Sequence, residues 1–324
     1  MANSQGLQLV VTEVRAETPL IRSLVLARPH GAPLPSWQPG AHIDIQLPGG
    51  GERSYSLINL KSDPDAGTRP AAYRLGVRLE DPSTGGSRFM HGLKRGDTVQ
   101  ITPPSNNFPL EPDHRPVVLV AGGIGVTPIV SMAGALSAEQ RPFRFYYAGR
   151  KRQELAFLTE INALCADKLT IHADDEVGGF FDIKALMGSL KGGERLYCCG
   201  PLPMIETAIA AAKELGWEQE RLRFELFAAA APRADDASFE VVLKSTGESF
   251  QIPSDKSILD VLIEAGKDPL YDCKRGDCGI CQVTVLEGVP DHRDYILSDA
   301  EKAEGKMMQI CVSRSKTPRL VIDL

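Results

Sequence analysis

The sequence predicts a multidomain chain: an antiparallel β-barrel, then an α/β domain with a parallel sheet, then a small α+β domain. Three observations predict this order: short alternating strands up to about residue 110, strand–turn–helix units after Pro116, and a cysteine-rich module near the carboxyl end. With 324 residues and 43% hydrophobic content, the chain is long enough for two or three cores. The expected boundaries are a barrel at 1–111, an α/β domain at 112–228, a linker at 229–238 and a last domain at 239–324.

The predicted barrel consists of short runs of alternating polar and apolar residues, separated by clusters of Pro, Gly and Asp. These runs read LQLVVTEV, IRSLVLAR, HIDIQL, RSYSLINL, YRLGVRL and TVQIT. From Pro116 the pattern changes to a continuous apolar run, VVLVA, followed by a Gly-rich turn and the helical stretch PIVSMAGAL. The unit recurs, with FRFYYAG, LTIHA, RLYCCG and LRFELF as buried strands and ELAFLTEINALC, DIKALMGSL and PMIETAIAAAKELG as helices. This alternation predicts a parallel sheet.

The segment AAAAPRADDAS, residues 228–238, has little reason to pack and is typical of a linker. Beyond it, FEVVLKSTGESFQI predicts a hairpin and SILDVLIEAG a helix. Because the linker is expected to be flexible, we expect a monomer in which the last domain keeps some freedom.

The acidic charge is concentrated in the carboxyl-terminal part of the chain. Residues 234–324 hold 11 Lys and Arg against 17 Asp and Glu, whereas residues 1–233 balance at 25 against 25. This distribution argues against nucleic acid as a partner, and it fits either docking on a basic protein surface or a solvated acidic face. The opening MANSQGLQLVV lacks the pattern of a signal peptide, and no apolar run approaches the roughly 20 residues that span a bilayer. We therefore expect a cytoplasmic protein without membrane contact.

Four of the seven cysteines lie after residue 270, which is not the distribution of a secreted disulfide framework. Cys273, Cys278 and Cys281 are spaced C-x4-C-x2-C, and Cys311 follows after 29 intervening residues. This is the spacing of a plant-type ferredoxin, in which four thiolates hold a [2Fe-2S] cluster. A zinc site is the alternative, although zinc cysteines usually come as two C-x2-C pairs. Gly276 and Gly279 would let the loop wrap closely, while Cys165 and Cys198 are interpreted as core residues.

Two turns predict a nucleotide site at the carboxyl edge of the parallel sheet. The first, in VVLVAGGIGVTP, places Gly122, Gly123 and Gly125 between a strand and a helix, where glycines admit a phosphate close to the backbone. The second, Cys199-Gly200-Pro201, follows another buried strand. A tight loop without a ligand is the alternative for the first turn, and a small buried side chain is the alternative for Cys199.

A third motif lies in the predicted barrel. Arg53, Ser54, Tyr55 and Ser56 occupy an alternating strand, so Arg53 and Tyr55 project to one face and offer a guanidinium to a phosphate and a ring to a flavin. The segment STGGSR, residues 83–88, precedes a predicted helix and offers backbone amides and a Ser hydroxyl to the same phosphate. Taken alone, the motif is more typical of an exposed Arg on a strand beside a loop.

These three motif sets, in this order, resemble the phthalate dioxygenase reductase family, which also includes vanillate demethylase reductases. RSYS is similar to the family's flavin-binding R-x-Y-S, GGIGVTP and CGP to its pyridine-nucleotide motifs, and the cysteine module to its ferredoxin. DHRDYILSDAE at 291–301 and CVSRS at 311–315 also resemble that module. The resemblance covers nearly the whole chain. It implies a flavin-binding barrel, an NAD(P)-binding α/β domain and a C-terminal ferredoxin domain of the β-grasp fold.

The resemblance also implies FMN rather than FAD as the flavin. The residues it places around the flavin are Arg53, Ser54, Tyr55, Ser56, Val77, Arg78, Gly85, Gly86, Ser87, Thr127 and Phe227. Phe227 is similar to a phenylalanine that stacks on the flavin ring. The family usually has Gly at the next position, where this chain has Ala228.

Family membership favours NADH, but the basic run of GRKRQE, with Arg150, Lys151 and Arg152, leaves NADPH open. The electron partner implied by the resemblance is a terminal Rieske-type oxygenase. Hydride carries two electrons and the cluster accepts one, so a flavin is the required converter between them, and no acid or base residue is expected. The alternatives are a reductase that serves a P450 or free flavin, and a redox sensor without turnover.

Overall fold

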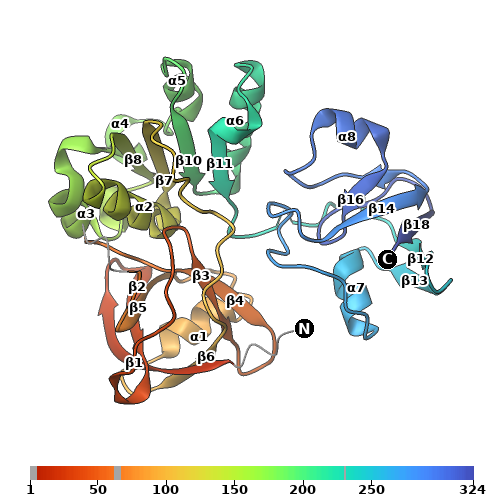
Figure 1. Cartoon of the computed structure of the whole chain (residues 1–324), viewed down its shortest axis with the longest axis horizontal. Coiled ribbons are helices and arrows are strands. Elements are labelled where there is room, and N and C mark those ends of the chain that lie inside the picture. The colour runs from red at the N-terminus through yellow and green to blue at the C-terminus, as the bar shows by residue number, and fades with distance from the viewer. Residues whose placement is uncertain (1–5, 62–66, 230) are drawn as a thin grey trace. The chain divides into compact units, whose positions relative to one another are not determined.

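The computed structural model describes residues 6–61, 67–229 and 231–324, which form two compact units, 1–225 and 226–324 (Figure 1). Residue 230 of the expected linker and residues 1–5 of the opening stretch lie outside the described residues. No helix in the described ranges has the length and apolar character required to cross a membrane.

The first unit begins with a six-stranded antiparallel sheet in the order β4-β3-β6-β1-β2-β5. Its strands are β1 (Leu7–Ala16), β2 (Ile21–Ala27), β3 (His42–Gln46), β4 (Glu52–Ser56), β5 (Ala72–Arg78) and β6 (Thr98–Ile101). The amide of Ile58, just after β4, donates to the carbonyl of Arg74 in β5 at 2.9 Å. Because this bond joins the two end strands of the sheet, the sheet curls into a barrel.

The alternation that predicted these strands places every second side chain inside the barrel. Leu9 and Val11 in β1, and Leu24 and Leu26 in β2, are fully buried in one apolar core. The short helix α1 (Gly86–Gly92) contributes the buried Met90 to the same core.

The second part of this unit is a parallel sheet in the order β11-β10-β7-β8-β9. Its strands are β7 (Val117–Gly122), β8 (Phe143–Gly149), β9 (Leu169–Ala173), β10 (Arg195–Cys199) and β11 (Leu222–Glu225). The helices between them are α2 (Val126–Ala138), α3 (Leu158–Cys165), α4 (Asp174–Val177), α5 (Ile183–Gly188) and α6 (Leu202–Glu214). Short 3-10 turns add η1 (Pro29–Gly31), η2 (Gly123–Gly125), η3 (Arg152–Glu154), η4 (Ala166–Lys168) and η5 (Gln219–Arg221).

The central strands are buried on both faces, as their continuous apolar runs predicted. Leu119 and Ala121 of β7 share a core with α2 and α3, whereas Val118 and Val120, which point the other way, are also buried. One expected helix is shorter than its apolar pattern: α3 begins at Leu158 and not at Glu154. The reason is the left-handed backbone of Phe157, with φ 63°, which no α-helix accommodates.

The barrel and the parallel sheet are joined through α2. The Ser131 hydroxyl donates to the carbonyl of Leu57 at 2.7 Å and accepts from the amide of Asn59 at 2.9 Å. One turn later, Gly134 lets the helix approach the chain after β4, because a Cβ there would lie 2.9 Å from the carbonyl oxygen of Lys61. The middle of α2 is thereby held against the barrel.

The second unit carries a five-stranded mixed sheet in the order β13-β12-β18-β14-β16. Its elements are β12 (Phe239–Leu243), β13 (Ser249–Ile252), α7 (Ile258–Glu264), β14 (Gln282–Glu287), β15 (Pro290–Asp291), α8 (Asp299–Glu304), β16 (Met307–Gln309), β17 (Arg314–Ser315) and β18 (Arg319–Asp323). The expected hairpin β12–β13 forms, β12 pairs in parallel with the last long strand β18, and α7 packs its buried Leu259 and Leu262 on the sheet. A helix crossing a mixed sheet whose first and last strands pair in parallel is the β-grasp arrangement.

The end of the expected linker differs from the expectation that it has little reason to pack. The Asp236 side chain is only 4% exposed and accepts hydrogen bonds from both terminal nitrogens of Arg293. The guanidinium of Arg314 lies 3.8 Å from the same carboxylate. These contacts hold the Asp236 pKa down, to about 2. Asp236 therefore anchors the chain to the second unit before β12 begins.

Candidate cofactor-binding sites

The two predicted turns of the nucleotide site meet at the carboxyl edge of the parallel sheet. Strand β10 pairs with β7 so that Cys199 lies beside Ala121, and each turn follows directly. A Cβ on Gly125 would stand 2.2 Å from the Cys199 carbonyl oxygen, and one on Gly122 would stand 2.6 Å from Cδ of Pro201. Only glycine allows this approach of the two backbones. The two turns therefore lie together at the carboxyl edge of the sheet. Their residues are Gly122, Gly123, Gly125, Cys199, Gly200 and Pro201.

The cysteines of the parallel-sheet domain are enclosed. Cys198 and Cys199 are fully buried, and Cys165 is nearly so. Burial raises the pKa of Cys198 to about 12 and that of Cys165 to about 11, which keeps both thiols protonated at neutral pH. The carbonyl oxygen of the buried Cys199 lies beside Gly125, so the backbone of Cys199 forms part of the place where the two turns meet.

In the barrel, the structure brings the strand motif and the Gly-Gly-Ser segment together. A Cβ on Gly86 would lie 2.6 Å from Cγ of Arg53 and 3.3 Å from the hydroxyl of Tyr55, so both side chains reach the start of α1 from the same face of β4. The Arg53 guanidinium is exposed and bonds to the hydroxyl of Thr84 at 3.2 Å and to the carbonyl of Glu52 at 2.8 Å. Burial raises the pKa of Tyr55 to about 12, so its hydroxyl stays protonated.

The serines of these two segments differ in orientation. Ser54, between Arg53 and Tyr55, turns away and donates to the Asp44 carboxylate in β3 at 2.6 Å. Ser56 is buried at the end of β4. The Ser87 hydroxyl accepts from the amide of Glu80 at 3.1 Å and lies 2.9 Å from the Ser83 hydroxyl. Gly85, with φ 104°, makes the turn that leads into α1.

Three further residues implied by the resemblance lie around β5. The Val77 side chain is buried in the barrel core, and its carbonyl oxygen lies 2.9 Å from a ring nitrogen of His91. Arg78 pairs with Glu80 at 3.0 Å. Thr127 at the start of α2 donates to the carbonyl of Ile124 at 3.1 Å, and its methyl group would be 2.9 Å from a Cβ on Gly76 in β5. Phe227 belongs to the second unit and exposes 41% of its surface, a large fraction for an aromatic ring.

In the second unit the four predicted ligand cysteines converge. Hydrogen bonds from the thiols of Cys278 and Cys311 hold the pKa of Cys273 far below its ordinary value, and the Cys311 thiol does the same for Cys281. The Arg275 amide donates to the sulfur of Cys273 at 3.3 Å. The same hydrogen bonds raise the pKa of Cys278 and of Cys311, so thiolate character is favoured at Cys273 and Cys281, two of the four cysteines.

The four thiols form one contiguous group. Cys273 contacts both Cys278 and Cys311, and Cys311 contacts Cys281. Four cysteine thiolates can hold a [2Fe-2S] cluster, and the C-x4-C-x2-C spacing is the feature that favours the cluster over zinc.

The cluster loop depends on left-handed backbone. Gly276 and Gly279 both have φ 81°, and a Cβ on Gly276 would lie 2.7 Å from a methyl group of Val312. Sequence reasoning missed Asp277 in this loop, which accepts from the amide of Leu226 at 2.9 Å and whose pKa burial raises to about 7. The sequence signal that could have drawn attention to Asp277 is an acidic residue between two predicted ligand cysteines.

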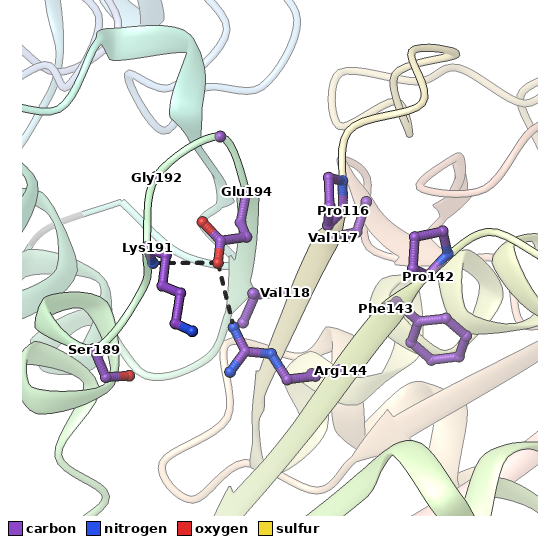
Figure 2. A pocket seen from close by; sticks show the side chains of 11 residues that line it. Pro116, Val117, Val118, Pro142, Phe143, Arg144, Ser189, Lys191, Gly192 and Glu194 are labelled. Atoms are coloured by element: carbon purple, nitrogen blue, oxygen red, sulfur yellow. Dashed lines mark hydrogen bonds and ion pairs between the residues drawn. The ribbon is translucent and has the colours of Figure 1, made fainter.

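A cavity of about 450 Å³ lies at the opposite edge of the parallel sheet (Figure 2). It is lined by Val117 and Phe143 at the amino ends of β7 and β8, and by the loop that precedes β10. Glu194 accepts from the Lys191 amide at 3.3 Å and lies 3.8 Å from the Arg144 guanidinium beside it. No predicted site residue lines this cavity. Ligands of open parallel sheets bind at the carboxyl edge, so we assign the cavity no part in the site.

Comparisons with known proteins agree with this geometry. The family model for the 2Fe-2S iron-sulfur cluster binding domain matches residues 241–316, and that for the N-terminal domain of dimethylamine monooxygenase subunit DmmA-like proteins matches residues 101–222. The vanillate O-demethylase oxidoreductase of Pseudomonas sp. (strain HR199 / DSM 7063) is 40% identical over 98% of this chain and 100% of its own length. The phthalate dioxygenase reductase of Burkholderia cepacia is 37% identical, over 94% and 93%.

Solved structures extend the match to the fold. A phthalate dioxygenase reductase, described as a modular structure for electron transfer from pyridine nucleotides to [2Fe-2S], aligns with a TM-score of 0.75 and 35% identity over 99% of this chain and 98% of its own. This chain belongs to the phthalate dioxygenase reductase family. A type IV self-sufficient cytochrome P450 monooxygenase also aligns, with a TM-score of 0.76 and 33% identity, over 98% of this chain but 41% of that one.

Family membership confirms the resemblance read from the three motif sets. The predicted fold class is confirmed as well, with an antiparallel barrel, a parallel-sheet domain and a C-terminal [2Fe-2S] domain. As a member of the phthalate dioxygenase reductase family, the chain is an electron-transferring oxidoreductase. The roles of individual site residues and the domain boundaries remain predictions.

Proposed function

We propose that the chain takes hydride from NADH onto FMN and passes single electrons through a [2Fe-2S] cluster to a terminal Rieske-type oxygenase. One observation carries the proposal: a single chain combines two Gly-containing turns that meet at the carboxyl edge of a parallel sheet, where nucleotides bind, with a four-cysteine loop suited to a one-electron carrier. A bound flavin supplies the conversion between two-electron and one-electron transfer. Everything else in the scheme is binding and positioning by this chain.

The flavin phosphate is assigned to the space beside Gly86. Because Gly86 has no Cβ, the Arg53 and Tyr55 side chains can pack against its backbone, and the exposed Arg53 guanidinium supplies the charge. Ser87 and the amides of Gly85 and Gly86 complete the phosphate site. Tyr55, Val77, Arg78 and Thr127 would lie along the flavin, with Ser54 and Ser56 fixing the strand that carries the motif. Since the Val77 side chain is in the core, only the backbone of Val77 can contact the flavin.

The nicotinamide nucleotide is assigned to the crevice formed by the Gly122–Gly125 turn and the Cys199-Gly200-Pro201 turn. Close contact between their backbones supports this, because a bulkier residue at Gly125 would close the crevice. Phe227 is proposed to stack on the flavin ring, as the family resemblance implies. Its exposed ring supports that role. Ala228, in place of the family's usual Gly, adds one methyl group beside the ring.

Cys273, Cys278, Cys281 and Cys311 are proposed as the cluster ligands. Their mutual thiol contacts and their C-x4-C-x2-C spacing support this assignment, and Gly276 and Gly279 provide the left-handed turns that a tight loop needs. The amide of Arg275 already donates to Cys273. Such bonds stabilise negative charge on the sulfurs and so raise the potential of the cluster.

The electron acceptor is proposed from the relatives. Several are named as reductase parts of oxygenase systems, including the Burkholderia phthalate dioxygenase reductase. A cytochrome P450 is the second candidate, because the same arrangement aligns within a self-sufficient P450 monooxygenase.

The proposal is tested with purified holoprotein, a Rieske-type oxygenase and a P450 supplied as alternative acceptors. We expect NADH-dependent product only with the oxygenase, and FMN as the extracted flavin. Cys281→Ala should keep NADH-dependent reduction of ferricyanide, which accepts electrons from flavins, but lose transfer to the oxygenase. Cys165→Ala, a buried cysteine outside the loop, is the matched control and should keep both activities. Product with the P450 alone would favour the second candidate, and full oxygenase activity in Cys281→Ala would refute the electron path.

A further inference from the structure

A bidentate ion pair occupies the guanidinium of Arg152 just after β8. Its Nε donates to one carboxylate oxygen of Glu176 and its terminal nitrogen to the other, each at 2.7 Å. The two side chains are 48% and 46% exposed, and the pair holds the pKa of Glu176 below its ordinary value. At neutral pH an ionised carboxylate therefore fills one whole edge of this guanidinium.

The pair lies on the sheet edge where the proposed nucleotide crevice opens. Gly122 at the end of β7 pairs with Ala148 in β8, and Gly149 pairs with Ala173 at the end of β9. Arg152 follows β8, and Glu176 follows β9 in α4, so both belong to the carboxyl edge. In dinucleotide-binding sheets the segment after the strand next to the Gly-rich turn contacts the adenosine ribose, and an Arg there accommodates a 2′-phosphate.

The surroundings of Arg152 balance the basic run that precedes it. The segment after β8 carries Arg150, Lys151 and Arg152, and the segment after β9 carries Asp174, Asp175 and Glu176, three charges of each sign. The Asp175 amide also donates to the carbonyl of Arg150 at 3.1 Å, which ties the two segments together. A 2′-phosphate carries about −1.5 to −2 charges at pH 7. The phosphate would meet no excess of positive charge here. It would also have to compete with the Glu176 carboxylate, which already occupies the two N–H groups (the fork) of the Arg152 guanidinium. A 2′-hydroxyl is uncharged and needs neither the positive charge nor the guanidinium.

We propose that Glu176 is a specificity-determining residue that disfavours NADPH by occupying the phosphate-binding edge of Arg152. The inference rests on the proposed nucleotide function of this edge. It accounts for a basic run that suits NADPH in a chain proposed to use NADH. A guanidinium binds carboxylate and phosphate through the same pair of parallel N–H groups, so the two anions compete for it.

The test is calorimetric titration of the holoprotein with AMP and with adenosine 2′,5′-bisphosphate. Glu176→Ala frees the fork of Arg152, whereas Asp175→Ala removes the same charge from the same short helix and leaves the pair intact. Both positions are exposed, so the variants should fold. We expect Glu176→Ala to bind the bisphosphate about tenfold more tightly than the wild type does and to bind AMP unchanged. In Glu176→Ala/Arg152→Gln the gain should disappear.

Equal bisphosphate affinity in Glu176→Ala and the wild type would overturn the inference. An equal gain in Asp175→Ala would overturn it as well, because net charge and not the occupied fork would then set the preference. If AMP fails to bind to the wild-type chain, the nucleotide site of the proposed function falls, and the inference falls with it. If AMP binds but Glu176→Ala does not bind the bisphosphate more tightly than the wild type does, the proposed function stands and only the role of Glu176 is lost.

Discussion

Replacing Gly86 by Ala tests the proposed flavin phosphate site with a single methyl group. The new Cβ would lie 2.6 Å from Cγ of Arg53 and 3.3 Å from the hydroxyl of Tyr55. Carbon atoms in contact prefer about 3.5 to 4.0 Å, so the Arg53 side chain must move by about 1 Å or turn away. Because Arg53 is exposed, it can do so at little cost to stability, and replacing Gly by Ala lowers the conformational entropy of the unfolded chain, which contributes about 0.4 to 1 kcal/mol. We therefore expect an unfolding free energy that is equal or slightly higher.

Flavin affinity should change much more. A hydrogen bond to a charged group contributes about 1.5 to 3 kcal/mol. Losing the Arg53 bond to phosphate should therefore raise the dissociation constant for FMN by about 10-fold to 150-fold. The assay is quenching of FMN fluorescence as apoprotein is added, with urea unfolding alongside. Gly92→Ala is the matched control, since it lies on the same helix with open space around its Cβ.

A double variant separates displacement of Arg53 from a general disturbance of the helix. If Gly86→Ala acts through Arg53, then adding it to Arg53→Gln should weaken FMN binding no further. The reasoning is refuted if Gly86→Ala and Gly92→Ala bind FMN equally well, or if the two substitutions at Gly86 and Arg53 have additive effects.

Two further predictions concern the crevice and the anchored segment. Gly125→Ala should lower the unfolding free energy by about 1 to 3 kcal/mol and weaken nucleotide binding, because its Cβ would stand 2.2 Å from a backbone oxygen that cannot turn away. The control in urea unfolding is Gly188→Ala, whose Cβ would lie in open space. An equal urea midpoint for the two variants would contradict the prediction. Asp236→Asn should cost about 2 kcal/mol at pH 7, since Arg293 lowers the folded-state pKa from 3.8 to about 2. Because the pKa is lowered on folding, this contribution is complete above about pH 4 and disappears as the pH falls through about 2. The check is the free energy of unfolding measured from pH 7 to pH 2, with Asp235→Asn, at an exposed position, as control. A difference in unfolding free energy between the wild type and Asp236→Asn that does not change with pH would contradict the prediction.

Features that depend on neighbouring residues could be predicted from the sequence. The C-x4-C-x2-C loop and the Gly-rich turn are local: their spacing and their glycines constrain the backbone within a few residues. The left-handed Gly276 and Gly279 and the close approach of Gly125 to Cys199 show why glycine occupies these positions. The buried strands could be predicted because an apolar run flanked by turns has few other ways to be buried.

Features that depend on residues distant in the sequence could not be predicted in this way. The partner of Arg152 is Glu176, which becomes adjacent only when β8 pairs with β9. Asp236 lies in a segment whose composition is typical of a linker, and its partner Arg293 is 57 positions away. Similarly, the early part of the expected helix at 154–165 has a helical apolar pattern, yet Phe157 takes a left-handed backbone that ends the pattern before α3 begins.

Anaerobic titration with NADH, followed by visible and electron paramagnetic resonance spectra, tests the central claim most directly. Two electrons on the flavin and one on the cluster make three, so full reduction should require about 1.5 NADH per chain, with both centres reduced. Cys281→Ala should require about one. Reduction of the flavin alone in the wild type, or a colourless protein that contains zinc, would contradict the account.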